Sequence, residues 1–242
     1  MPMASSLTEQ LQTYIDQSRR IVFFGGAGVS TESGIPDFRS ADGLYNQTYK
    51  IPPEMIVSHR FFIARPEEFF AFYRDRVLKL DALPNAAHYK LAELEKAGKL
   101  TAVITQNIDG LHQKAGSEKV LELHGSIWRN YCMKCARAYE INVLTEAEGV
   151  PRCSCGGVIR PDVVLYEEAL DPFVLQQSEK RIREADLLIV GGTSLSVYPA
   201  AGLLHLFRGR LVLINRSETP QDRRASLVIH DKIGEVLDQI HV

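Results

Sequence analysis

Short runs of apolar residues recur along the chain, and each is followed by glycine, asparagine or another polar turn residue. The most regular runs are Ile21–Phe24, Ala102–Thr105, Leu187–Val190 and Leu211–Ile214. Runs of this length are typical of parallel strands that are buried on both faces. Helical spacing of apolar residues precedes two of them, over His88–Ala97 and Pro172–Ala185. The alternation predicts an α/β fold with its ligands at the carboxyl ends of the strands.

Two segments interrupt this alternation. The first, residues 42–83, contains an aromatic helical pattern over Glu67–Leu80 that indicates a buried face. The second, residues 127–159, holds all four cysteines and is rich in glycine. We therefore expect small insertions in the main fold. A last helix is predicted with Asp231 as its cap and with an apolar face of Ile233, Val236, Leu237 and Ile240.

Length, composition and charge narrow the class of protein. The 242 residues are 45% hydrophobic and 24% charged, which predicts one main globular core. Lys and Arg total 28 against 30 Asp and Glu, so nucleic acid and anionic lipid are not expected as partners. The first residues lack the pattern of a signal peptide, and no apolar run has the length of a membrane span, so we expect a cytoplasmic protein.

The cysteines form two pairs with the spacing of a metal site. Cys132 and Cys135 form a C-x2-C pair, and Cys153 and Cys155 form a C-x-C pair after 17 intervening residues. Gly156 and Gly157 permit the tight turn that the second pair requires. The pattern predicts a zinc ion, while a redox dithiol or buried free thiols are the alternatives. Because four thiolates complete a tetrahedral shell, the zinc is expected to be structural.

Two glycine corners follow predicted strands. Gly25–Ser30 follows the first strand, where glycines let backbone N–H groups approach a pyrophosphate. The dinucleotide fingerprint is incomplete because Thr31 occupies the place of its third glycine. A tight turn without a ligand is therefore the alternative. A second corner, Gly191–Ser194, offers further backbone donors and two hydroxyls, and this favours a nucleotide site.

Candidate catalytic residues follow the second strand and precede the cysteines. Thr105–Asp109 places amide and carboxylate groups where a ribose or a carboxamide would bind. His124 stands beside Gly125 after a short apolar segment. An imidazole with a pKa near 6.5 is a competent general base at neutral pH, although a single histidine also occurs as a structural residue.

Together these motifs resemble those of the sirtuin family. The resemblance runs in the right order from Ile21 to Ile233, and it is carried by Gly26–Arg39, Thr105–Asp109, Leu123–Gly125, the two cysteine pairs, Gly192–Ser194 and Asn215. It implies a Rossmann-like large domain of residues 1–41, 84–126 and 160–242. A small domain would consist of a helical insertion, residues 42–83, and a zinc module, residues 127–159.

The resemblance also implies an activity and a set of site residues. The expected reaction is the NAD-dependent removal of acetyl or other acyl groups from protein lysines, which yields nicotinamide, O-acyl-ADP-ribose and free lysine. His124 would be the general base and Asn107 a second catalytic residue. By the same resemblance, NAD would contact Gly26, Ala27, Thr31, Phe38, Arg39, Gln106, Ile108, Asp109, Gly192, Thr193, Ser194, Asn215 and Ile233.

Acylated-lysine proteins are the partners that the resemblance implies, and the enzyme is expected to be a monomer. The substrate peptide would lie extended against Val163, Val164 and Leu165 on one side and Val197 on the other. The chain departs from the family pattern at Glu167, where many relatives have glycine. Glu167 would either favour basic residues beside the acyl-lysine or be a solvated side chain.

Two questions stay open at the level of sequence. Tyr73 and Arg76 resemble a pair that some sirtuins use to hold succinyl or malonyl carboxylates, but Tyr73 also fits ordinary core packing. Mono-ADP-ribosyl transfer to proteins and a non-enzymatic NAD and zinc sensor are the rival functions. The first would move ADP-ribose onto protein, and the second would release no nicotinamide.

Overall fold

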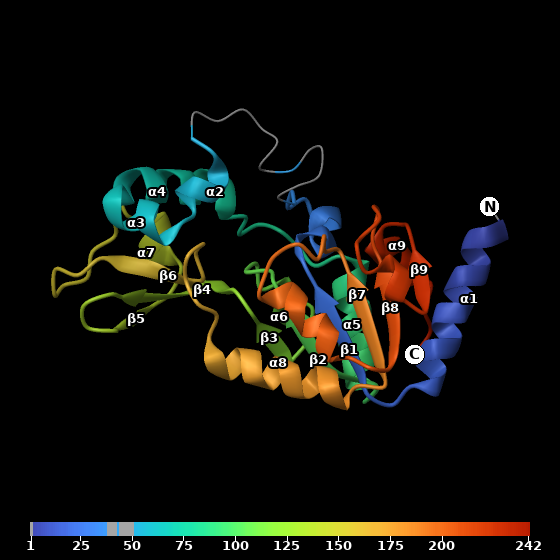
Figure 1. Cartoon of the computed structure of the whole chain (residues 1–242). Helices are drawn as coiled ribbons and strands as arrows, with labels where there is room; N and C mark the ends of the chain where they lie inside the picture. The colour runs from blue at the N-terminus through green and yellow to red at the C-terminus, as the bar shows by residue number, and fades with distance from the viewer. Residues whose placement is uncertain (1, 38–42, 44–50) are drawn as a thin grey trace.

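The apolar runs form the strands of one parallel sheet (Figure 1). The computed structural model describes residues 2–37, 43 and 51–242. Within these residues the main sheet has six strands in the order β3-β2-β1-β7-β8-β9. Their bounds are β1 Ile21–Gly25, β2 Leu100–Thr105, β3 Val120–Glu122, β7 Leu187–Gly191, β8 Arg210–Ile214 and β9 Leu227–Ile229. The predicted α/β class and the Rossmann-like sheet are confirmed.

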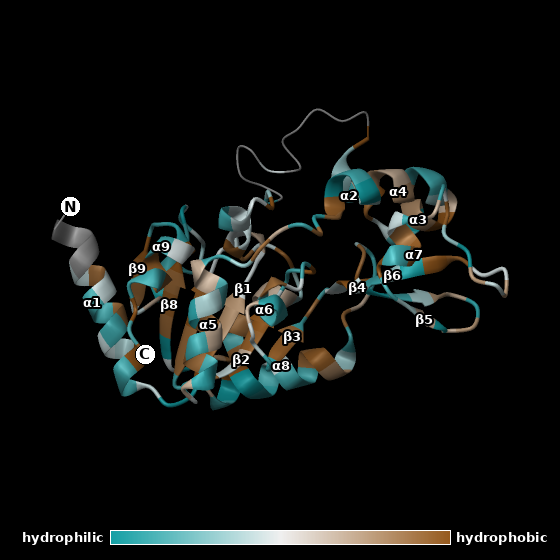
Figure 2. Cartoon of the chain, turned by 180° about the vertical axis from the view of Figure 1, so that it is seen from behind, coloured by the Kyte–Doolittle hydropathy of each residue, from teal (hydrophilic) through white to brown (hydrophobic). Residues whose placement is uncertain are grey.

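Helices cover both faces of this sheet. On one face, α1 (Pro2–Gln17), α5 (Ala86–Lys96) and α9 (Ile233–Asp238) bury their apolar residues against alternate positions of the strands (Figure 2). On the other face, α8 (Pro172–Glu184) and the 3-10 helix η5 (Ala200–Leu206) pack against the remaining strand positions. The strands are apolar at successive positions because both of their faces are covered.

Local caps explain where the two long interior helices begin. The Asn85 side chain accepts a hydrogen bond from Ala87 N at the start of α5, and His88 Nδ1 accepts from Asn85 N in return. Asp171 accepts from Phe173 N and Val174 N at the start of α8, where Pro172 occupies the first helical position. Side-chain oxygens thus satisfy N–H groups that have no partner within the helix.

The two interruptions pack together beside the main sheet. The helices α2 (Pro53–Ile56), α3 (His59–Ala64) and α4 (Pro66–Phe72) share a hydrophobic cluster with an antiparallel sheet in the order β5-β4-β6. The bounds here are β4 Gly125–Cys132, β5 Ala138–Tyr139, β6 Ile159–Val163 and α7 Asn142–Thr145. Figure 1 shows this unit at one end of the molecule, with α1 at the other end.

Two local expectations differ from the structure. Of the helix expected over Glu67–Leu80, the part up to Phe72 is α-helical, Tyr73–Val77 forms a π-helical turn, and the helical structure stops before Leu78. Asp231 does not cap α9, because Lys232 occupies the cap position and the carboxylate of Glu32 accepts from Gly234 N at 2.7 Å. Other short helices in the part of the chain that the structure describes are α6 Leu111–Lys114 and the 3-10 turns η1 Ala27–Val29, η2 Thr31–Ser33 and η6 Asp222–Arg224.

Candidate active site

Sheet register brings the predicted site loops together. Gly25 at the end of β1 is level with Thr105 of β2 and with Gly191 of β7, and Gly191 is level with Ile214 of β8. The segments that follow these four strands therefore leave the sheet at one height. They contain nearly all of the predicted cofactor residues, as expected for the carboxyl edge of a parallel sheet.

The two glycine corners touch each other through their backbones. Gly28 N donates to the carbonyl oxygen of Gly192 at 2.8 Å, and Gly26 N donates to that of Gly191 at 3.3 Å. A Cβ atom added at Gly28 would lie 2.7 Å from Gly192 Cα, which no side chain tolerates. Gly192 also has a φ of 60°, in the left-handed region. Glycine is required here for loop-to-loop packing as well as for any ligand.

An amide network links the second corner to its neighbours. Asn215 Oδ1 accepts from Thr193 N at 2.9 Å, and Gln106 Nε2 donates to Thr193 Oγ1 at 3.1 Å. The Nδ2 group of Asn215 is buried without a hydrogen-bond partner within the described residues. An unpaired buried donor at this edge fits a site built for a polar ligand such as a nucleotide.

The hydroxyl of Ser30 joins the first glycine corner, which follows β1, to the loop after β2. Asn107 Nδ2 donates to Ser30 Oγ at 3.0 Å, and Ser30 Oγ donates to Asp109 Oδ2 at 2.7 Å. Asp109 also accepts from Leu111 N. Ser30 belongs to the glycine corner, but no pattern in the sequence marks it as a site residue. Its position between Asn107 and Asp109 is visible only when β1 and β2 are aligned.

His124 follows β3 at the same edge of the sheet. Its Nδ1 atom lies 2.8 Å from the carbonyl oxygen of Gln106. Because a carbonyl can only accept, Nδ1 carries the proton of the neutral ring and Nε2 keeps a free lone pair. Burial lowers the pKa of His124 below its ordinary 6.5, and the hydrogen bond to Gln106 opposes this only in part. The neutral imidazole is therefore the form present at pH 7.

The remaining predicted cofactor residues surround these groups. Thr31 Oγ1 donates to the carbonyl oxygen of Gly28, and Ile233 is buried against Gly191. Ile108 is partly buried and packs against the hydrophobic cluster that includes Cys132 and Cys153. Ala27 lies in η1, and Ser194 donates to or accepts from Ser196 at 2.7 Å. Phe38 and Arg39 lie outside the described residues.

The predicted peptide residues come from two places. Val163 ends β6 and is level with Gly125 of β4, while Val164 N donates to the carbonyl oxygen of His124 at 3.0 Å. Leu165 N donates to Glu168 Oε2 at 2.8 Å. Val197 lies in the loop after β7. The segment 163–165 is thus joined directly to the residue predicted to be the base.

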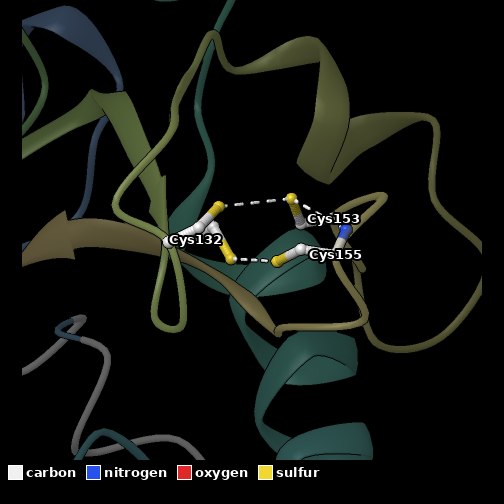
Figure 3. A group of neighbouring side chains, drawn as sticks. Cys132, Cys153 and Cys155 are labelled. Carbon is white, nitrogen blue, oxygen red and sulfur yellow. Dashed lines mark hydrogen bonds between the residues drawn. The ribbon is translucent and has the colours of Figure 1, made fainter.

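The four cysteines converge on one point. Cys132 Sγ lies 3.5 Å from Cys155 Sγ, Cys135 Sγ lies 3.7 Å from Cys153 Sγ, and all four sulfur atoms are within 4.8 Å of one another (Figure 3). Zn–S bonds of about 2.3 Å in a tetrahedron put sulfurs about 3.8 Å apart, so the donor set fits zinc. Gly156 has the φ of 82° that the predicted tight turn requires.

Known proteins of one family resemble this chain over most of its length. The chain matches the Sir2 family model over residues 26–199. It is 56% identical over 236 residues to a protein of Clostridium acetobutylicum named NAD-dependent protein deacetylase, with 96% of both chains covered. A protein of the same name from Cutibacterium acnes is 57% identical over 235 residues, again with 96% of both chains covered.

Solved structures agree with the sequence relatives. A Sir2 structure with a p53 peptide and NAD+ has a TM-score of 0.86 and 41% identity, and 95% of each chain is covered. A Sir2 structure with a deacetylated p53 peptide and 3'-O-acetyl-ADP-ribose has a TM-score of 0.89, 40% identity and the same coverage. The resemblance expected from the motifs is therefore confirmed, and the chain belongs to the Sir2 family.

Proposed function

We propose that this chain is an NAD-dependent protein-lysine deacetylase in which His124 is the general base. The observation that carries the proposal is the hydrogen bond from His124 Nδ1 to the Gln106 carbonyl, which leaves Nε2 free as a base. The relatives at 56% and 57% identity bear the name of this activity. The products are nicotinamide, O-acetyl-ADP-ribose and free lysine.

The cofactor site would be formed by the loops at the carboxyl edge of the sheet. We assign the nicotinamide half of NAD to Gln106, Asn107, Ile108 and Asp109, and the adenosine half to Thr193, Ser194, Asn215 and Ile233. Gly26, Ala27, Thr31, Phe38 and Arg39 would form the loop over the cofactor, with Gly192 packed beneath it. When bound, NAD supplies the ribose carbon that accepts the acyl oxygen of lysine.

The chain's own groups prepare this chemistry in two ways. The Asn107–Ser30–Asp109 hydrogen bonds fix the amide and the carboxylate before any ligand enters, so that little reorganisation is needed. His124 Nε2 accepts a proton from a ribose hydroxyl, because its ring is neutral at pH 7 and held in one tautomer. Asn107 acts beside it by orienting the ribose.

The substrate would be an acetylated protein segment in extended conformation. We place it between Val163, Val164 and Leu165 and the segment around Val197, where backbone pairing accepts many sequences. We further propose that the enzyme acts as a cytoplasmic monomer with the two domains expected from the sequence. No helix in residues 2–37, 43 and 51–242 is long and apolar enough to cross a membrane.

The zinc would hold the small domain together without taking part in the reaction. Four thiolates leave no coordination position for water or substrate. The metal would join the turn at Cys132 and Cys135 to the turn at Cys153 and Cys155, and its loss would therefore cost stability.

A product assay tests the function as a whole. Wild-type protein is incubated with NAD and an acetyl-lysine peptide, and nicotinamide, free-lysine peptide and O-acetyl-ADP-ribose are measured by mass spectrometry. Equal amounts of the three products are expected. Transfer of label from the adenylate half of NAD onto protein would instead indicate ADP-ribosyl transfer, and binding of NAD without nicotinamide release would indicate a sensor.

A further inference from the structure

Glu167 stands in an unfavourable backbone conformation at the turn that follows the predicted peptide segment. Its φ is 75°, in the left-handed region that glycine adopts easily and that side chains with a Cβ atom avoid. A glutamate here needs a compensating interaction, because nothing in the turn itself rewards a side chain.

Arg60, at the start of α3, provides that interaction. Arg60 Nη2 donates to Glu167 Oε1 at 2.8 Å, and Arg60 N donates to Glu167 Oε2 at 3.2 Å. Both carboxylate oxygens of Glu167 are therefore engaged by one residue that is 107 positions away in the sequence. The backbone contact lies in the first turn of α3, where N–H groups lack partners within the helix.

The backbone around this pair is fixed as well. His59 N donates to the carbonyl oxygen of Tyr166, and Tyr166 N donates to that of Val57. The neighbouring Glu168 is bound by the guanidinium of Arg160, with Nη1–Oε1 at 2.7 Å and Nη2–Oε2 at 2.9 Å. Each acidic residue of the turn thus has its own arginine, so the turn presents no unbalanced charge.

We propose that Arg60 masks Glu167 and so makes this enzyme indifferent to the charge of residues that flank the acyl-lysine. This inference rests on the proposed function, because it places the substrate beside residues 163–165. The Arg60 side chain is 83% exposed and that of Glu167 is 41% exposed, so a substrate side chain can reach both. Without the mask, the carboxylate at the rim would attract lysine or arginine.

Arg60→Gln tests the mask without moving the carboxylate. The backbone N–H of residue 60 remains available to Glu167, so the charge is uncovered in place. The assay measures kcat/KM for three acetyl-lysine peptides that differ only in flanking arginine, glutamine or glutamate. In wild-type protein the three values are expected to agree within about twofold. In Arg60→Gln the ratio of the arginine to the glutamate peptide is expected to rise about threefold to fivefold.

Two further variants test whether the uncovered charge of Glu167 causes the change in the peptide ratio. In the double variant Arg60→Gln with Glu167→Gln the ratio should return to the wild-type value. Arg65→Gln is the matched control, because Arg65 is an exposed arginine at the other end of α3 that pairs with Glu68 and not with Glu167. It should leave the ratio unchanged. The preference in Arg60→Gln should also weaken at 1 M salt.

The proposal is overturned if Arg60→Gln has the wild-type ratio, or if wild-type protein already prefers the arginine peptide and Glu167→Gln removes that preference. Fluorescence anisotropy with labelled forms of the same peptides gives the ratio of their binding affinities without turnover. Absence of turnover with the glutamine peptide would count against the proposed function, while the binding ratio would still test the mask.

Discussion

The loops at the carboxyl edge of the main sheet and the turn beside the small domain are held by different means. At the sheet edge, Gly28 and Gly192 touch through their backbones, and the strands set the height of every loop. Beside the main sheet, four thiolates bring the two cysteine turns together, and Arg60 pairs with Glu167 across 107 positions of the sequence. Arg160 pairs with the neighbouring Glu168, which is only 8 positions away. Close packing therefore positions the loops that we assign to the cofactor, whereas metal binding and charge would position the segments beside the proposed peptide.

Because the two regions are held by different interactions, different changes should disrupt them. Substitutions at the sheet edge should impair cofactor binding because they alter the shape of a packed surface. Metal removal, acid or loss of a charged partner should loosen the small domain first.

Removal of the zinc should have the largest effect. Cys135→Ala leaves three thiolates and an incomplete shell, so we expect zinc loss, a fall in unfolding temperature of roughly 10 °C or more, and little deacetylation. Metal content and calorimetry measure the first two. Met133→Ala is the control, because Met133 lies between Cys132 and Cys135 and its side chain is exposed. This variant should keep its zinc. Full zinc content in Cys135→Ala would contradict the four-thiolate site.

Gly28→Ala should damage the cofactor side selectively. The added methyl group meets Gly192 Cα at 2.7 Å, so we expect a loss of about 1–3 kcal/mol in stability and a fall of at least about tenfold in NAD affinity. Calorimetric titration with NAD measures the affinity. Gly202→Ala is the matched control, because its nearest neighbour would be at 3.8 Å. Equal NAD affinity in the two variants would show that the corners are not closely packed.

Glu168→Gln should show how much the ionised carboxylate of Glu168 stabilises the protein, because that stabilisation depends on pH. Burial opposes ionisation of Glu168, but hydrogen bonds from Arg160, Leu165 N and His59 outweigh it and lower the pKa to about 2, from an ordinary 4.5. The stabilisation is therefore complete above about pH 4.5 and disappears as the pH falls through 2. We expect the variant to lose about 1–3 kcal/mol at pH 7.

Denaturant unfolding at several pH values measures that loss. The difference between wild type and Glu168→Gln should shrink between about pH 4.5 and pH 2. Glu68→Gln, which removes one member of an exposed pair, should show little difference at any pH. A loss in Glu168→Gln that is independent of pH would assign the effect to shape and not to charge.

Tyr73→Phe should have the smallest effect. Tyr73 is 1% exposed, stacks on Phe69, and its hydroxyl has no hydrogen-bond partner in the described residues. Arg76 forms an ion pair with Asp75, with its Nε atom 2.6 Å from Oδ2. Loss of the hydroxyl should change stability by less than about 1 kcal/mol and leave an acetyl preference over succinyl unchanged. A selective loss of succinyl-lysine turnover would instead favour a carboxylate-binding role.

The sequence was sufficient for the buried strands and the metal ligands, because both have strong local signals. Ile21–Phe24 and Leu187–Val190 are apolar at every position, and cysteine spacing reports a metal site directly. The strands β3 and β9 were not predicted because three residues are too few for a pattern. The sheet β5-β4-β6 was not predicted because it is partly exposed and polar.

Long-range contacts set the limit of the prediction. Ser30 joins Asn107 to Asp109, Glu32 reaches Gly234, and Arg60 reaches Glu167, each across a large sequence separation. A departure from a family pattern, such as the glutamate at position 167, marks where to look. Its partner and its left-handed backbone become visible only in three dimensions.

The proposed role of His124 as the base of an NAD-dependent deacetylase is tested most directly by comparing His124→Ala with wild type. Deacetylation of an acetyl-lysine peptide is measured together with NAD affinity by calorimetric titration. We predict that deacetylation falls at least about 100-fold while NAD affinity changes little, because Gln106 and Asn107 keep their own hydrogen bonds to Thr193 and Ser30 when the imidazole is removed. Near wild-type deacetylation by His124→Ala would contradict the account.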